Sequence, residues 1–135
     1  MKSYFKEKTK KRSGTSYWIK RLWRTFAPYI RARDNYTCYT CGSTKNPQAG
    51  HYIPKSVSRL SLYFDERNVH CQCSHCNLYL KGNPRAYVIE LERQYGHGIL
   101  QEFDAKRFQI EKWTDEDFME KENYFKCKMA LLSQP

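Results

Sequence analysis

The sequence lacks long apolar segments. No run approaches the roughly 18 consecutive apolar residues of a membrane-spanning helix, so we expect no membrane partner. The basic start passes through residues 9–14 without the apolar stretch of a secretory signal peptide. We therefore expect a reducing, cytoplasmic compartment, in which the six cysteines are more suited to metal binding than to disulfides.

The chain also lacks an internal repeat and the length for two independent cores. Its 135 residues fall in the range of one domain. Aromatic residues make up 16% of the composition, which favours a packed core. We expect residues 1–15 to form a basic, disordered arm and residues 16–135 to form a single domain.

Acidic residues are nearly absent from the start of the chain. Residues 1–33 hold 11 Lys or Arg against one acid, Glu7, whereas the other 102 residues hold 13 bases and 13 acids. A positive end on a neutral body suits a polyanion, because bases that neutralise phosphates release condensed counterions. A solubilising tail is the alternative. The residues assigned to DNA binding are Lys10, Lys11, Arg12, Lys20, Arg21, Arg24, Arg31 and Arg33.

Apolar residues recur at helical spacing between residues 17 and 30, with bases largely between them. Pro28 should kink this helix or start a new turn, because proline lacks a backbone donor. We expect the apolar face to be core, with a partner chain or phosphates as alternative contacts.

The rest of the pattern predicts an α+β fold. Short apolar stretches at 50–53 and 68–71 could pair as a hairpin, although the strand signal is weak. Helices are expected from Pro84 to Gly96, around 99–103, and after Thr114, which forms a capping-box pattern with Asp117.

Two CxxC pairs give the strongest single signal. Cys38 and Cys41 are followed by Cys73 and Cys76, and two tight turns of this spacing can complete a tetrahedral four-thiolate zinc shell. Gly42 supplies the permissive backbone that the first turn needs. Two redox pairs are the alternative, but such pairs usually accompany a βαβ pattern, which this sequence lacks.

Four thiolates would saturate the zinc ion and leave no position for water. The zinc would therefore be structural rather than catalytic, and it would clamp two distant segments of a short chain. Cys71 and Cys127 are left over, and we interpret both as small core residues.

The residues around the cysteines resemble the HNH, or ββα-metal, nucleases. His51, Asn68 and Asn77 match three motif positions: a histidine after the first CxxC, an asparagine five residues before the third cysteine, and an asparagine directly after the fourth. The resemblance implies that His51 is the general base, that Asn77 binds Mg²⁺ or Mn²⁺, and that Asn68 braces the loop carrying the base.

One position departs from the HNH pattern. Many of these nucleases place a metal-binding aspartate just before the histidine, where this chain has Gly50. Either Glu66 or Asp65 replaces it, or the scissile phosphate supplies most of the charge. Glu66 and His70 are also predicted as possible members of a second metal shell. His75 and His97 are expected to take no part.

Longer segments narrow the resemblance to the NinG/Rap recombination endonucleases of lambdoid phages. The segments that carry it run from about residue 16 to residue 130 and include Ser16–Lys20, Tyr29–Asp34, Ala49–Tyr52, Glu66–His70, Gln72–Cys73, Cys76–Asn77, Gly82–Asn83, Glu90–Leu91 and Arg107–Thr114. The resemblance implies a small ββα-metal core stapled by zinc and flanked by N-terminal and C-terminal helices.

The family resemblance implies cleavage of branched DNA, such as Holliday junctions and D-loops, in the cytoplasm of a host bacterium. Symmetric cleavage of a junction needs two active sites, so we expect a homodimer. Two alternatives remain open: a generic HNH nuclease of homing or restriction type that cuts ordinary duplex, and a non-catalytic zinc-knuckle module that binds DNA.

Overall fold

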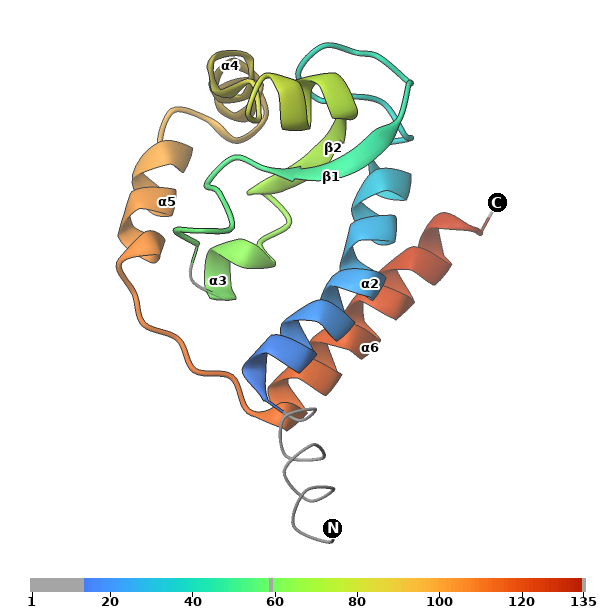
Figure 1. The fold of residues 1–135 in the computed structure, drawn as a ribbon, viewed down its shortest axis with the longest axis vertical. Helices are drawn as coiled ribbons and strands as arrows, with labels where there is room; N and C mark the ends of the chain where they lie inside the picture. Colours follow the sequence, from blue (N-terminus) through green and yellow to red (C-terminus); the bar gives the residue numbers. More distant parts are fainter. Residues whose placement is uncertain (1–13, 59, 135) are drawn as a thin grey trace, which may run out of the picture.

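The fold is built around a two-stranded antiparallel hairpin (Figure 1). The computed structural model describes residues 14–58 and 60–134. Strand β1 (Pro47–His51) pairs with β2 (Val69–Cys73), and His51 lies opposite Val69. The predicted hairpin is confirmed, although β1 begins three residues earlier than its apolar pattern. Packing on both faces of the hairpin supports a segment whose intrinsic strand propensity is low.

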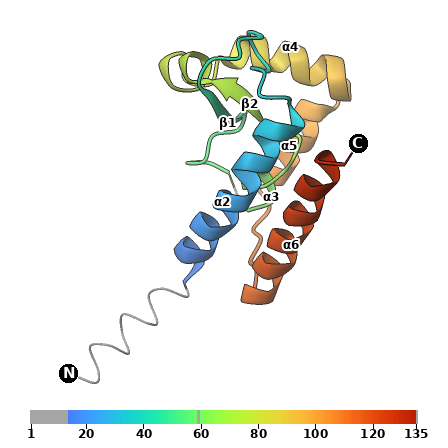
Figure 2. The same ribbon diagram turned by 90° about the vertical axis from the view of Figure 1, so that its right-hand side faces the viewer.

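Helices α2 (Thr15–Arg33) and α6 (Asp115–Leu132) pack side by side and run in the same direction (Figures 1 and 2). Their interface is aromatic and extends to the hairpin. The core members are Trp18, Leu22, Phe26, Tyr29, Ile30, Ala49, Phe64, Val69, Phe118 and Phe125. The apolar face of α2 is therefore core, as expected.

Helix α2 continues through Pro28 as one element, so the proline does not divide it into two helices. Ala27, Tyr29 and Ile30 on either side of the proline are buried in the core. This packing outweighs the loss of one backbone hydrogen bond, because tertiary contacts supply most of a helix's stability.

Helices α4 (Pro84–Tyr95) and α5 (Ile99–Arg107) lie on the other side of the hairpin from α2 and α6 (Figure 1). A second core packs there, formed by Ile53, Leu62, Tyr87, Leu91, Ile99 and Phe103. Two short elements complete the fold: helix α3 (Leu60–Tyr63) between the strands, and a π-helical turn, η1 (His75–Tyr79), directly after β2.

The predicted start of α6 is confirmed. Thr114 Oγ1 accepts a hydrogen bond from the backbone of Asp117, and the Asp117 carboxylate accepts one from the Thr114 backbone. The chain is thus a mixed α+β protein with a small sheet. In the described part, no helix has the length and apolar character needed to cross a membrane.

Candidate functional site

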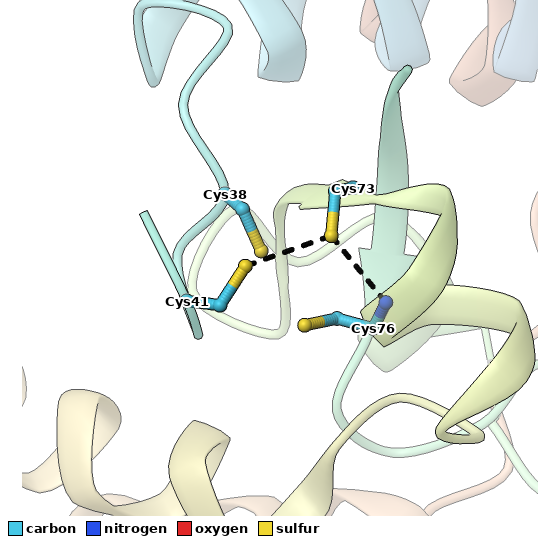
Figure 3. Close-up of side chains that lie close together, drawn as sticks. All are labelled: Cys38, Cys41, Cys73 and Cys76. Atoms are coloured by element: carbon cyan, nitrogen blue, oxygen red, sulfur yellow. Dashed lines mark hydrogen bonds between the residues drawn. The ribbon is translucent and has the colours of Figure 1, made fainter. Parts of the chain in front are cut away.

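The four predicted cysteines form one cluster (Figure 3). Their sulfur atoms all lie within 4.8 Å of one another, and Cys41 Sγ is 3.6 Å from Cys73 Sγ. Four thiolates bound at about 2.3 Å around a tetrahedral ion would be separated by about 3.8 Å. The cluster could therefore hold one metal ion.

Local structure aims the two pairs of thiols at this point. The Cys38 carbonyl accepts from the Gly42 backbone at 2.9 Å, and Gly42 adopts φ +80°, which glycine alone takes readily. In the second pair, the Cys76 amide donates to Cys73 Sγ at 3.4 Å. Burial raises the pKa of Cys73, so a bound cation is needed to favour its thiolate form.

The two remaining cysteines differ from each other. Cys71 is fully buried, as predicted, and its backbone N–H donates to Asp34. Cys127 is exposed on α6, so its assignment to the core is wrong. Cys127 follows the buried Phe125 by two residues, which places it on a different side of the helix.

His51 lies at the end of β1 and is 9% exposed. Its ring stacks on Trp23 of α2 with centroids 5.2 Å apart, and its Nε2 lies 2.8 Å from the carbonyl oxygen of Tyr63. Because that oxygen can only accept, Nε2 carries the proton and Nδ1 carries a lone pair. Burial, aided by the charge of Lys55, lowers the pKa of His51 to about 4 and keeps the imidazole neutral at pH 7.

Asn68 is fully buried and connects the segments on either side of the hairpin loop. Its Oδ1 accepts from the Ile53 backbone at 2.8 Å, and its Nδ2 donates to the carbonyls of Ile53 and Leu62 at 3.2 and 2.9 Å. These bonds hold the chain that follows His51 next to the chain that precedes Tyr63, whose carbonyl orients the His51 ring.

Asn77 lies in η1 and shares a pocket of about 490 Å³ with His51. Its Nδ2 donates to Gln48 Oε1 at 2.8 Å, and its Oδ1 lies next to Gly50. The pocket is lined by Ala49, His51, Tyr52, Pro54, Lys55, Ser56, Asn77, Leu78, Lys81 and Gly82. A larger pocket of about 650 Å³ beside α6 contains no predicted site residue.

The charged groups that line the pocket are both bases. Lys55 Nζ lies 4.1 Å from the ring centroid of Trp23, and Lys81, in the turn after η1, also lines the pocket. Among the described residues, no carboxylate lines the pocket. The pocket is thus suited to an anion, with a neutral imidazole and an amide beside it.

Gly50 is required by close packing. A Cβ at this position would overlap Gln72 Oε1 and would lie 2.9 Å from Asn77 Oδ1. An aspartate therefore has no room at position 50 without displacing a buried side chain, which explains the departure from the HNH pattern.

Glu66 and His70 do not reach this pocket. The Glu66 carboxylate accepts from Tyr29 at 2.7 Å, on the α2 side of the hairpin. His70 is buried among tyrosines, stacking on Tyr39 and contacting the hydroxyls of Tyr87 and Tyr95 at 3.2 Å. Their predicted place in a second metal shell beside Asn77 is therefore not supported by the geometry.

The basic residues assigned to DNA fall into three groups. Lys10, Lys11 and Arg12 lie outside the described residues. Arg33 donates to the carbonyls of Glu66 and Val69 at 2.7 and 2.9 Å, and Arg21 pairs with Glu122, so both make internal contacts. The remaining bases of α2, which have solvent-accessible surface, are Lys20, Arg24 and Arg31.

Sequence reasoning missed three groups around His51: Trp23 and the Tyr63 carbonyl, which contact its ring, and Lys55, which lines the pocket. Trp23 belongs to an amphipathic pattern that predicted only helix packing, and a backbone carbonyl leaves no signal in the sequence. Lys55 follows His51 by four residues in a loop, and no spacing rule connects such a pair.

The chain resembles a known group of phage proteins over nearly its whole length. The family model described as Bacteriophage Lambda NinG protein matches residues 2–134. Protein ninG of Escherichia phage 933W is 36% identical over 105 residues, covering 76% of this chain and 51% of that protein. Protein ninG of Salmonella phage P22 and that of Escherichia phage lambda are each 35% identical over 105 residues, covering 51% and 50% of their lengths.

The chain therefore spans about half the length of the curated relatives it matches. No solved structure matches it.

Proposed function

The chain belongs to the NinG family of bacteriophage proteins, and from this premise we propose that it is a structure-selective DNA endonuclease that cleaves branched DNA in phage recombination. The observation that carries the proposal is the pocket shared by His51 and Asn77. A hairpin with His51 at the end of its first strand, followed by a helical turn that contains Asn77, is the order of elements expected for an HNH, or ββα-metal, core.

His51 is the general base in this proposal. Hydrolysis of a phosphodiester requires removal of a proton from the attacking water. The Nε2–H bond to the Tyr63 carbonyl leaves Nδ1 as the acceptor, and the lowered pKa keeps that nitrogen unprotonated at neutral pH. Stacking on Trp23 holds the ring in place.

Lys55 and Lys81 bind the scissile phosphate. Both line the pocket, and their charges oppose the negative charge that develops on the phosphorus oxygens. The exposed bases Lys20 and Arg24 flank Trp23 on α2 and extend the positive surface along the DNA backbone.

A divalent cation, Mg²⁺ or Mn²⁺, fits the donor set only in part. Amide oxygens such as Asn77 Oδ1 are donors that hard cations accept, but the pocket lining offers no carboxylate. When bound, the cation would neutralise charge on the phosphate and on the departing oxygen. Asn77 would hold it, and the DNA phosphate would supply most of the opposing charge.

Zinc is the metal proposed for the four-cysteine cluster. A closed shell of four thiolates is typical of structural zinc and leaves no open position for water. A zinc ion in this role connects the loop after α2 to the β2–η1 segment (Figure 3). It thereby positions Asn77, which directly follows Cys76.

Symmetric cleavage of a four-way junction requires two pockets, so we propose a homodimer on DNA. The apolar face of α2 is buried within the chain, so the interface must use another surface. Sedimentation of the protein with and without junction DNA tests the dimer, and a strict monomer in both conditions would contradict it.

The test of the proposed function compares a synthetic four-way junction, a flap and a linear duplex, each with Mg²⁺ or Mn²⁺. Wild type should cleave the junction fastest, and His51→Ala should lose cleavage while retaining zinc. His97→Ala is the matched control, because His97 is exposed and pairs only with Glu92.

Two outcomes would favour other functions. Equal cleavage rates on all three substrates would indicate a generic HNH duplex nuclease. Binding without cleavage, unaffected by His51→Ala, would indicate a non-catalytic zinc-knuckle module.

A further inference from the structure

Three consecutive apolar side chains are exposed on the turn that follows Asn77. Leu78, Tyr79 and Leu80 are 65%, 78% and 40% exposed, respectively, and we call them the apolar turn. Apolar residues scattered singly over a surface are ordinary, but a contiguous exposed patch indicates contact with a ligand or a partner. Leu78 also lines the pocket that contains His51, so the apolar turn lies at the edge of that pocket.

The backbone holds the apolar turn in a defined conformation. The Leu80 amide donates to the His75 carbonyl at 2.8 Å, and the Gly82 amide donates to the Cys76 carbonyl at 2.8 Å. Cys76 is itself buried in the four-cysteine cluster. The His75 ring stacks on Tyr79 with centroids 5.1 Å apart. The Tyr79 ring is therefore preorganised while most of its surface stays open, which reduces the entropy lost when a ligand binds.

The charges around the apolar turn favour a nucleic acid as the ligand. Lys81 and Arg85 follow the turn and are exposed, and residues 67–89 contain no Asp or Glu. Lys81 and Leu78 line the same pocket. Proteins that bind unpaired nucleotides combine such features, because Lys and Arg neutralise the phosphates while the nucleobases stack on aromatic side chains.

A second copy of the chain fits this surface less well. In a twofold dimer the same patch faces itself, so Lys81 and Arg85 would approach the same two residues of the other copy. The 67–89 segment offers no acid to compensate for these charges. Like charges that meet at an interface oppose association, whereas a nucleic acid neutralises them.

Stacking on Tyr79 requires a nucleobase with an exposed face. Inside a continuous duplex, neighbouring nucleobases cover both faces, and a side chain can enter only if the duplex is unstacked at a cost in free energy. This cost is smallest where a nucleobase is already unpaired, as at a branch point. A preorganised aromatic ring beside the pocket can therefore distinguish branched DNA from linear duplex.

We infer that the apolar turn binds an unstacked nucleobase at the branch point of DNA, with Tyr79 stacking on its face and Leu78 and Leu80 packing against it. The inference rests on the proposed function and gives a physical origin for its selectivity. Because Leu78 lines the pocket, the unstacked nucleotide lies next to the phosphate that would be cut.

Binding without cleavage tests the inference. The affinity of zinc-loaded protein for a fluorescent four-way junction and for a linear duplex is measured by anisotropy without Mg²⁺ or Mn²⁺. Wild type should prefer the junction, and Tyr79→Ala should weaken junction binding at least about fivefold while changing duplex binding less than about twofold. Tyr79→Phe keeps the ring and should stay within about twofold of wild type. Tyr124→Ala is the control, because it removes an exposed tyrosine from α6.

Three results would overturn the inference. The first is equal wild-type affinity for junction and duplex, and the second is an equal loss on both substrates in Tyr79→Ala. The third is unchanged junction binding by Tyr79→Ala. If that third result accompanies the loss of a dimer in sedimentation, the apolar turn binds a second copy instead of a nucleobase.

Photocrosslinking locates the contact. 5-Iododeoxyuridine is placed at the branch point of one junction and in the middle of an arm of another, and each complex is irradiated. The probe at the branch point should crosslink to the tryptic peptide 68–81, which contains the apolar turn, and Tyr79→Ala should abolish this crosslink. Equal crosslinking from the arm would contradict an unstacked nucleobase as the ligand.

The two proposals can fail separately. Junction binding and cleavage that are the same in wild type and Tyr79→Ala would overturn the stacking contact and leave the nuclease intact. Selective, Tyr79-dependent junction binding, without cleavage of any substrate in Mg²⁺ or Mn²⁺, would refute the nuclease and retain the stacking contact.

Discussion

Replacing Asn68 with alanine is expected to lower the free energy of unfolding by about 4 to 5 kcal/mol. The side chain is fully buried and makes three hydrogen bonds to the backbone of Ile53 and Leu62. Each bond contributes about 1 kcal/mol, and the Ile53 N–H left buried without a partner adds about 1 to 2 kcal/mol. Domains are stable by only about 5 to 15 kcal/mol, so this is a large loss.

Urea unfolding of the zinc-loaded protein measures the loss, with tryptophan fluorescence as the signal because Trp23 contacts His51. Asn123→Ala is the control, since Asn123 is exposed on α6 and its replacement should change the unfolding free energy by no more than about 0.5 kcal/mol. The Asn68 variant should also lose cleavage, because the loop that orients His51 is released. A loss below about 1 kcal/mol would refute the bracing role assigned to Asn68.

Three further predictions concern charge. The unfolded His51 imidazole gains a proton near pH 6.5, but the folded one does so only near pH 4. The contribution of the neutral ring to the free energy of unfolding is therefore fully present above pH 6.5 and decreases as the pH falls toward 4. Between pH 7 and pH 5, wild type should lose about 2 kcal/mol more unfolding free energy than His51→Gln, and equal losses would disprove burial of a neutral ring. Lys55→Met should make the slope of log K against log salt for junction binding shallower by about 0.9; an unchanged slope would exclude a Lys55–phosphate contact. Arg33→Ala should cost about 3 kcal/mol of unfolding free energy, whereas Arg24→Ala should weaken DNA binding with stability unchanged, and the reverse pattern would contradict their assigned roles.

Several features were predictable because the interactions that create them are local. The capping box at Thr114, the helix start at Pro84 and the positive φ at Gly42 each depend on residues within a few positions. The four-cysteine cluster was predictable as well, because CxxC spacing limits what two tight turns can do. The geometry of such features can be predicted because the interacting residues are close together in the sequence.

Other features depended on contacts between distant segments. Arg33 and Arg21 belong to a basic pattern that suggested DNA binding. In the fold, however, Arg33 donates to the backbone of β2 and Arg21 pairs with Glu122. Glu66 and His70 lie near the motif in sequence, but the alternation of side chains and the tyrosines around His70 direct them elsewhere.

The sequence by itself determined the four-cysteine cluster, the longer helices and the order of His51, Asn68 and Asn77, because spacing along the chain constrains each of them. Only the tertiary structure decided what surrounds His51 and what fills the space beside Gly50. Trp23 and the Tyr63 carbonyl contact the His51 ring, and Gln72 packs against Gly50, each from a separate element. Their positions result from packing of the whole core, in which each placement depends on all the others and no short segment specifies it.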